Sequence, residues 1–515
     1  MSQIRLLSCV VSGGLALSGV ALADVLDDIG HTDLLERLGS DAPTGAGVIV
    51  GQIEVPDPGY GPNRSNGDFD GVSFIERSGV SGTSSHATEV ATNFYGTSLS
   101  PAPGIGTVNL WDVNDFVGSG FLRVGTSQSP ASPPSGLKVF NHSWIGAFPA
   151  ASSNNEAIRR ADYSSNTFRT LWVLGVANGA GSVGEPLLSG MFHGLSVGLA
   201  NGNHASTDTA AGLDGPGRMK PEIVAPAEFS SFSTPLVGAC GALLYETIET
   251  VPELASSSGA GQVHVVKAIL LAGAVRDADW TNEPSTSPGD RGVTARPIDE
   301  VFGAGVVNVD RAHRILTGLE QDGETTVPAS ATLEGPGWDF ESMSVGETLW
   351  HRFTLDAPAE EVGIAMTWNR IVPSSAQSSV LADLDLELFS VDGTTVAALR
   401  GADSSVFASG NVASESRVDN LEMLHVRGLA AGEYAVRITR VDSQSGSART
   451  GVAFWLPESE DDGLPGDLDG DGRVNGSDFG LLLVAFGSND PNADLDGDGV
   501  VAGGDVGVLL SYWTG

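Results

Sequence analysis

Cysteine is almost absent from this chain. Its 515 residues include 2 cysteines, Cys9 and Cys240. Cys9 falls in an amino-terminal stretch that we expect to be removed on export, so the mature chain would keep Cys240 alone and form no internal disulfide. Stability is therefore expected to come from the burial of apolar side chains and from bound ions.

Basic residues are also scarce, with 26 Lys and Arg against 64 Asp and Glu and a net charge of −38. A protein that binds nucleic acid needs a basic face for the phosphate backbone, and this composition offers none. The hydrophobic fraction of 41% is ordinary for a folded chain, so the charge does not predict disorder. We therefore expect a folded protein without a nucleic-acid partner.

The amino terminus carries Arg5, then an apolar stretch, and then small residues at 21–23. This pattern predicts a secretory signal peptide over 1–23, cut at its end. A transmembrane anchor is the alternative, but serines and glycines interrupt the apolar stretch and no basic stop follows it. The mature chain is expected to have no membrane span and to be secreted or held at the cell surface.

Several domains are expected, because one hydrophobic core stops growing at roughly 250–300 residues. Shifts in composition divide the mature chain into three folded parts and two links. These are an α/β part over 24–318, a link over 319–330, an antiparallel β-sandwich over 331–456, a link over 457–466, and a small loop–helix repeat domain over 467–515.

The first part alternates continuous apolar runs with helical patterns. Such runs predict strands buried on both faces of a mostly parallel sheet, covered by helices. The predicted strands are 48–53, 139–141 and 171–176, and the predicted helices are 86–95, 156–163, 235–247 and 263–272. In the second part, apolar residues alternate with small or polar ones at 362–368, 384–388 and 434–438, which predicts antiparallel strands.

The last part repeats one acidic motif twice. Carboxylates stand at positions 1, 3, 5 and 12 of each loop, with glycine at position 6 for a sharp turn: Asp467, Asp469, Asp471 and Asp478, then Asp494, Asp496, Asp498 and Asp505. Calcium prefers six to eight oxygen ligands, and this spacing can provide them. A solvated acidic tail is the alternative, but two copies in one register favour two Ca²⁺ ions.

An apolar helical segment follows each loop, at 479–486 and 506–513. The tail thus resembles a type I dockerin module, a pair of calcium loop–helix repeats that docks onto a cohesin. The resemblance implies a cohesin-like or cell-surface partner. Small residues occupy the positions where that family usually contacts its partner, at 476–477 and 503–504.

Four residues of the first part, far apart in the sequence, have the residue types and neighbours expected of a site for nucleophilic catalysis. Glu54 ends an apolar strand, His86 begins HATEVA, Asn178 follows another strand in LGVANG, and Ser231 precedes STP at a probable helix start. A serine hydroxyl needs an imidazole to take its proton, and a carboxylate to orient that imidazole. An amide donor would stabilise the oxyanion that forms.

This order of acid, histidine, amide and serine resembles that of the subtilisin-like serine peptidases. The resemblance extends to VKAILLAGA at 266–274 and FGAGVVNVDRA at 302–312, and the second part is similar to a β-sandwich often appended to such peptidases. It implies catalytic roles for Glu54, His86, Asn178 and Ser231. It also implies that a strand carrying Ser143, Trp144, Ile145 and Gly146 pairs with the backbone of protein or peptide substrates.

The sequence offers alternatives for several of these roles. Ser230 rivals Ser231 as the nucleophile, Asp57 is a second carboxylate, and His142 and His193 are expected to be structural. The family acid is usually Asp rather than Glu, and the segment between Pro226 and the serine is short. The chain is thus expected to be a secreted serine endopeptidase tethered by its tail, or else an inactive scaffold of the same fold that acts in adhesion.

Overall fold

The computed structural model describes residues 5–7, 22–182, 187–206, 208–457, 465–469 and 473–514. They form two compact units, one of Met1–Leu34 with Pro43–Pro457 and a smaller one of Leu35–Ala42 with Glu458–Gly515. The predicted signal segment lies outside the described residues, apart from strand β1 (Arg5–Leu7) and the start of helix α1 (Leu22–Asp28). Among the residues in these ranges, no helix has the length and apolar character needed to span a membrane.

The larger unit contains a seven-stranded parallel sheet in the order β3-β4-β2-β5-β7-β8-β9. Its strands are β2 (Ile49–Glu54), β3 (Ser73–Glu76), β4 (Thr107–Asp112), β5 (Leu137–His142), β7 (Leu171–Gly175), β8 (Leu195–Leu199) and β9 (Ile223–Ala225). The three strands predicted from continuous apolar runs are β2, β5 and β7, and their burial confirms that prediction.

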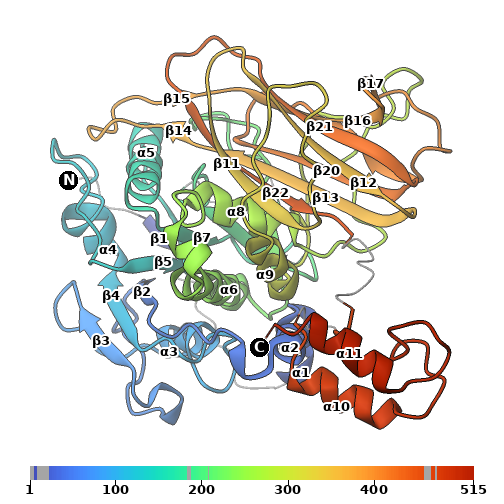
Figure 1. Ribbon diagram of the computed structural model, residues 1–515. Helices are drawn as coiled ribbons and strands as arrows, with labels where there is room; N and C mark the ends of the chain where they lie inside the picture. The colour runs from blue at the N-terminus through green and yellow to red at the C-terminus, as the bar shows by residue number, and fades with distance from the viewer. Residues whose placement is uncertain are drawn as a thin grey trace. The chain divides into compact units, whose positions relative to one another are not determined.

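Helices accompany this sheet (Figure 1). They are α3 (Ser85–Phe94), α4 (Val113–Asp115), α5 (Ala151–Phe168), α6 (Ser230–Thr250), α7 (Pro252–Ser256), α8 (Val263–Ala272) and α9 (Val309–Thr317). Helix α2 (His31–Leu38) contains the boundary between the two units, which falls after Leu34. Each of the four predicted helices is present, and α8 has the predicted bounds. The α/β fold class is confirmed.

A β-sandwich follows in the same unit. One sheet has the order β11-β22-β13-β20-β18 and the other β10-β19-β16-β21-β12, with β17 paired to β16. The strands are β10 (Val293–Thr294), β11 (Gly337–Met343), β12 (Thr348–Leu355), β13 (Ala359–Trp368), β16 (Leu384–Asp392), β17 (Thr395–Ala398), β18 (Ser409–Asn411), β19 (Ala413–Ser414), β20 (Leu421–Leu429), β21 (Gly432–Arg440) and β22 (Ala448–Trp455), besides a short pair, β14 (Arg370–Ile371) and β15 (Val380–Leu381). Strand β10 lies in the sequence before the predicted link at 319–330, but it pairs with β19 and therefore belongs to a sheet of the sandwich.

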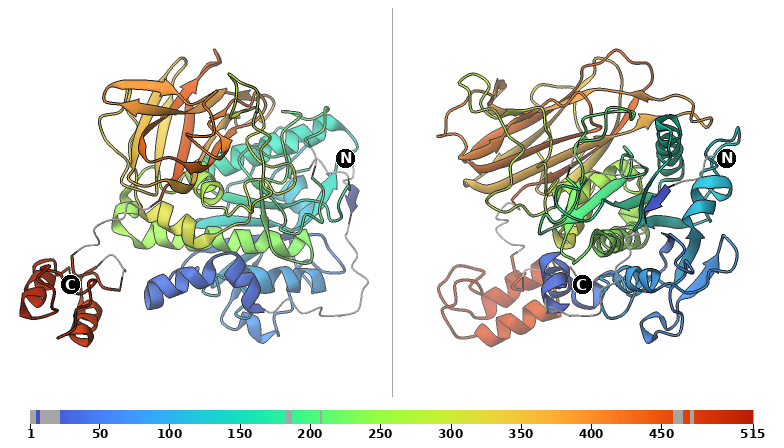
Figure 2. Two further views of the ribbon diagram at one scale, coloured as in Figure 1. Left: turned by 90° about the vertical axis from the view of Figure 1, so that its right-hand side faces the viewer. Right: turned by 180° about the vertical axis from the view of Figure 1, so that it is seen from behind.

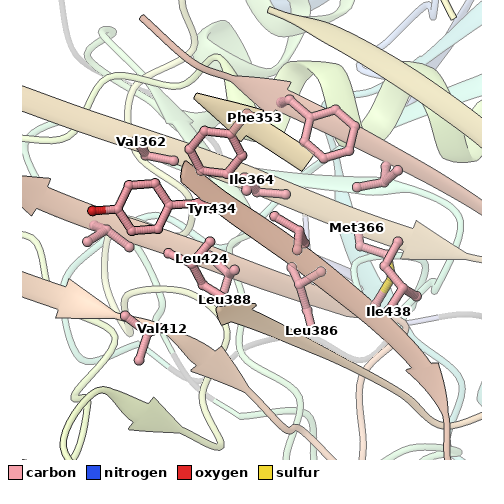
Figure 3. Close-up of a cluster of buried hydrophobic side chains, with 14 of the residues drawn as sticks. Phe353, Val362, Ile364, Met366, Leu386, Leu388, Val412, Leu424, Tyr434 and Ile438 are labelled. Carbon is pink, nitrogen blue, oxygen red and sulfur yellow. The ribbon is translucent and has the colours of Figure 1, made fainter. Parts of the chain in front are cut away.

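The space between the two sheets is filled by apolar side chains (Figure 3). Alternate residues of facing strands point into it, among them Ile364 and Met366 of β13 and Leu386 and Leu388 of β16, all fully buried. This alternation is the pattern that predicted the strands. The two layers are visible in Figure 2.

Helix α8 packs against the five-stranded sheet, beside β13 and β22 (Figure 1). Gly451 of β22 allows the helix and the sheet to approach closely, because a Cβ at this position would lie 2.6 Å from the backbone nitrogen of Val265 in α8. Buried ion pairs cross the same joint, with Arg276 2.7 Å from Glu361 and Arg370 3.3 Å from Asp162. The sandwich and the parallel sheet are therefore parts of one packed body.

The smaller unit contains helices α10 (Gly476–Ala485) and α11 (Gly503–Ser511), drawn in red in Figure 2. Each follows one of the acidic loops, as the sequence predicts. Five apolar side chains form its small core: Val474, Leu482, Ala493, Val501 and Leu509. The repeats are also joined by backbone hydrogen bonds, such as Thr514 N to the carbonyl of Val474 at 2.9 Å.

Candidate active site

The predicted catalytic residues gather at one edge of the parallel sheet. The carboxyl ends of parallel strands meet at the same edge, where α/β proteins usually bind their ligands. Glu54 is the last residue of β2, Ser143 directly follows β5, and Asn178 follows β7. Helices α3 and α6 begin here too, with His86 and Ser231 in their first turns.

Glu54 and His86 form a direct pair. The Nδ1 atom of His86 lies 2.8 Å from Oε2 of Glu54. The glutamate side chain is 1% exposed and the imidazole 31%, so the carboxylate is buried while the ring can reach solvent. Because a carboxylate accepts hydrogen bonds, Nδ1 carries the proton and Nε2 of the neutral ring is an acceptor. Asp57 is exposed and does not contact the ring in the described structure.

The surroundings of the His86 imidazole change its pKa. Burial lowers the pKa of His86, whereas the charge of Glu54 and the hydrogen bond to it raise the pKa, with further contributions from Glu89 and Asp57. The net result is a pKa above the usual 6.5. The ring is therefore a stronger base than a solvated histidine, as a proton acceptor needs to be.

A buried polar chain holds Glu54 in place. The side-chain amide of Gln52 donates to Oε1 of Glu54 at 3.0 Å and to the carbonyl of Ala87 at 2.9 Å. Tyr95, at the end of α3, donates its hydroxyl to Oε1 of Gln52 at 2.6 Å. Neither Gln52 nor Tyr95 was predicted from the sequence. One signal was available, since Gln52 is a polar residue in an apolar strand, two positions before Glu54 and therefore on the same face.

The first turn of α6 distinguishes the two candidate serines. The hydroxyl of Ser230 donates to the carbonyl of Val176 at 2.6 Å, which makes this side chain part of the connection between α6 and β7. The hydroxyl of Ser231 has no hydrogen-bond partner among the described residues, the His86 imidazole included. The rings of His86 and Phe232 are 6.2 Å apart, so α3 and α6 begin side by side. Ser231 is thus the candidate serine whose hydroxyl makes no hydrogen bond in the described structure.

A proline accounts for the geometry of this turn. Pro235 has no N–H group, so it cannot donate to the carbonyl of Ser231 four residues earlier. The hydroxyl of Ser143 donates to that carbonyl instead, at 2.8 Å, and itself accepts a bond from Asn141 at 3.0 Å. The loop after β5 therefore fixes the backbone of Ser231.

Asn178 contacts the same turn. Its side-chain oxygen accepts a hydrogen bond from the backbone N–H of Ser230 at 2.8 Å, which fixes the orientation of the amide. The N–H groups of Phe232 and Ser233 both donate to the carbonyl of Phe229. Within the described part of the chain, the N–H of Ser231 has no acceptor, as is usual for the first residues of a helix.

The strand predicted to bind substrate is β6 (Ile145–Ala147). Its edge pairs antiparallel with β1, with Leu7 opposite Ile145 and Leu6 opposite Gly146. The side chains of Ser143 and Trp144 are buried, so of the predicted substrate-binding residues these two do not present an exposed side chain. The backbone of 145–146 is the part of the predicted segment that pairs with an extended chain.

The two histidines expected to be structural are buried in hydrogen-bonded or aromatic surroundings. Burial lowers the pKa of His142 to about 3, and its ring stacks on Trp172 with centroids 4.9 Å apart. Burial also lowers the pKa of His193 to about 4, against the opposing charge of Asp162. Its Nε2 accepts from the backbone N–H of Arg370 at 2.7 Å. Both rings are neutral at ordinary pH.

The acidic loops of the smaller unit form a second group of candidate residues. Carboxylate oxygens of Asp467, Asp469 and Asp478 all lie within 4.8 Å of one another, and so do those of Asp494, Asp496 and Asp505. Asp471 lies outside the described residues. Asp498 is not in the second group, and its Oδ1 accepts from the N–H of Val500 at 2.9 Å.

The position-12 aspartates hold both loops in the same way. Asp505 accepts bonds from the N–H groups of Leu495 and Asp496 at 2.7 and 3.1 Å, and Asp478 accepts the equivalent bonds from 468 and 469 at 2.8 and 3.1 Å. Oδ1 of Asp494 is buried without a partner in the described structure. A bound cation would satisfy that oxygen, so these residues fit a hard divalent ion.

The chain is similar in fold to solved proteases. No protein-family model matches the chain, and no curated protein matches it. Among solved structures it is similar to the prenylagaramide maturation protease PagA, with 18% identity over 56% of this chain and 99% of that one and a TM-score of 0.35. It is also similar to the MycP3 protease from the type VII (ESX-3) secretion system, with 14% identity over 58% of this chain and 89% of that one and a TM-score of 0.35. Both are proteases.

Proposed function

We propose that the chain is a serine endopeptidase that cleaves protein substrates through an acyl-enzyme. The observation that carries this proposal is the contact of the buried Glu54 carboxylate with the partly exposed His86 imidazole, 2.8 Å apart, beside the first turn of α6, where the Ser231 hydroxyl has no hydrogen-bond partner in the described structure. A carboxylate, an imidazole and a hydroxyl in this order are the groups that nucleophilic acyl transfer needs.

The proposed reaction begins with proton transfer. Nδ1 of His86 is held by Glu54, which leaves Nε2 to take the proton of Ser231 as its Oγ attacks the substrate carbonyl carbon. The C–N bond of the resulting tetrahedral intermediate then breaks, and His86 returns the proton to the leaving amine. Water attacks the acyl-enzyme by the same base catalysis and releases the acid. In both steps Glu54 stabilises the transient imidazolium.

Negative charge on the carbonyl oxygen needs fixed donors. The N–H of Ser231 at the start of α6 and the amide of Asn178 are the proposed ones, and each such donor is worth about 3–4 kcal/mol in the transition state. The amino-terminal end of a helix of 21 residues also favours an anion there. The antiparallel pairing of Arg5–Leu7 with β6 supports the proposal that this edge accepts an extended peptide.

The test is covalent labelling with a fluorophosphonate probe, which phosphonylates an activated serine. The wild-type chain should be labelled, Ser231→Ala should not, and the matched control Ser230→Ala should retain labelling, because Ser230 donates its hydroxyl to Val176. Folding of each variant is checked by circular dichroism. Labelling lost in Ser230→Ala but kept in Ser231→Ala would contradict the assignment.

The alternative is an inactive scaffold of the same fold. One observation favours it, namely that no hydrogen bond joins the Ser231 hydroxyl to the imidazole among the described residues. The same experiment separates the two functions, because a folded, calcium-loaded chain that takes no label would be the scaffold.

The tail is proposed to bind two Ca²⁺ ions through Asp467, Asp469, Asp471, Asp478 and their counterparts Asp494, Asp496, Asp498 and Asp505. In this proposal the protein is exported and its tail docks onto a cohesin-like or cell-surface partner. Exposed apolar side chains on α10 and α11 support a docking role, among them Leu483, Val484 and Leu510.

A further inference from the structure

Three carboxylates outside both sites meet where the parallel-sheet part joins the sandwich. Glu320 and Asp322 lie on the segment after α9, and Asp339 lies on β11. One carboxylate oxygen of each residue lies within 4.8 Å of the other two. The segment is held against β11 by backbone bonds, such as Gln321 N to the carbonyl of Trp338 at 2.8 Å.

A second observation points to a ligand at this position. Asp339 is 1% exposed, and its Oδ2 accepts bonds from Nε2 of His351 at 2.9 Å and from the N–H of Gly323 at 3.0 Å. Its Oδ1 is buried and has no hydrogen-bond partner in the described structure. An unpaired buried carboxylate oxygen is costly, so native proteins normally satisfy it with a donor or a metal.

Among the described residues, the one basic side chain that contacts the group is His351, through Oδ2 of Asp339. Within the described residues, no lysine or arginine forms an ion pair with Glu320, Asp322 or Asp339, and Arg352 nearby is paired with Glu433. The three carboxylates therefore repel one another unless a positive charge lies between them.

We infer that Glu320, Asp322 and Asp339 bind a hard divalent cation of the calcium class at this joint. Carboxylate oxygens are the ligands such an ion prefers, and backbone carbonyls and water can complete its coordination. A pocket of about 350 Å³ lined by Glu320, Asp322 and His351 gives the ion access from solvent. The hydrogen bond from His351 orients the Asp339 carboxylate toward the ion.

The site would connect three parts of the larger unit. Glu320 and Asp322 follow α9, Asp339 belongs to one sheet of the sandwich, and His351, which orients it, belongs to β12 of the other. The hydroxyl of Ser257, from the loop before α8, also donates to Glu320 at 3.0 Å. Cation binding would thus fix the sandwich to the parallel-sheet part, independently of the acidic loops in the tail.

Calcium titration calorimetry on the full chain tests the inference. Asp322 is exposed, so Asp322→Asn should leave the fold intact. This variant should lose one equivalent of bound Ca²⁺, or bind that equivalent at least 10-fold more weakly, because one of three carboxylates is gone. The matched control is Glu334→Gln, which removes an exposed charge from the same pocket without touching the cluster. Identical titrations for wild type and Asp322→Asn would overturn the site.

A second variant separates this site from the tail. In the full chain carrying Asp467→Asn and Asp494→Asn, the joint should still bind one Ca²⁺, and adding Asp322→Asn should abolish that binding or weaken it at least 10-fold. If the tail variant binds no calcium while remaining folded, the inference is wrong. This result would leave the proposed peptidase site and the proposed tail sites unaffected.

Discussion

Replacing Glu54 by glutamine removes one charge from the centre of the proposed site and keeps the shape of the side chain. In the wild type the carboxylate is buried, accepts from Gln52 at 3.0 Å and pairs with His86 at 2.8 Å. Glutamine at 54 would present either an N–H₂ group or an uncharged oxygen to the imidazole. The variant therefore loses the charge that stabilises the imidazolium, and also the group that selects the Nδ1–H tautomer.

The expected size follows from the burial of the Glu54 carboxylate, which is 1% exposed, beside an imidazole that is 31% exposed. Removing one partner of a buried ion pair costs about 3–5 kcal/mol. If this cost falls on the transition state, in which the imidazolium forms, kcat should fall by roughly 100- to 10,000-fold, since about 1.4 kcal/mol is tenfold in rate. The pKa of His86 should fall as well, because burial lowers it and the charge of Glu54 no longer opposes that effect.

Two assays measure these effects. Hydrolysis of an unstructured protein substrate gives kcat, and a pH titration of the His86 ring by NMR gives its pKa. In the wild type the base is neutral only above a raised pKa, so activity should climb with pH through a midpoint above 6.5, and Glu54→Gln should move that midpoint to lower pH. The control is Glu89→Gln, which removes an exposed charge that raises the His86 pKa less than Glu54 does and should change kcat by less than about threefold. A Glu54→Gln variant with wild-type kcat and an unchanged His86 pKa would refute the reasoning.

Two further predictions concern the tail and the joint. Treatment with EDTA should unfold α10 and α11, because the clustered aspartates repel one another without a cation; digestion of 473–514 by a protease at the same rate with and without EDTA would contradict this. Gly451→Ala should destabilise the larger unit by about 1–3 kcal/mol through overpacking, since the new Cβ would lie 2.6 Å from Val265 N. Denaturant unfolding measures the loss, and Gly106→Ala, whose nearest contact is 4.0 Å away, should cost less.

Local patterns in the sequence were enough to predict the fold class. Continuous apolar runs predicted β2, β5 and β7, and the alternation of apolar with small or polar residues predicted β13, β16 and β21. A strand buried on both faces is apolar at nearly every position, whereas a strand buried on one face is apolar at every second position. Helix starts were predicted less well. α6 begins at Ser230 rather than at Pro235, since the polar residues of its first turn interrupt the apolar pattern used to find it.

Contacts between distant segments could not be predicted in this way. The Tyr95–Gln52–Glu54 chain needs α3 to lie over β2, and the joint cluster needs Asp339 of β11 to return beside Glu320. Neither contact produces a periodic pattern or a fixed residue spacing in the sequence from which it could be predicted. The same holds for Ser143, whose role beneath Ser231 follows from the missing N–H of Pro235 and becomes visible only when β5 and α6 are side by side.

The most direct test of the central claim is the mass of the chain trapped during turnover. A peptide ester mixed with the protein and quenched in acid within the burst phase should add one acyl group per chain, and peptide mapping should locate it on Ser231. His86→Ala should show no such adduct, because nothing would take the proton of the hydroxyl. An acyl group on Ser230, or a folded wild-type chain that never acquires one, would contradict the account.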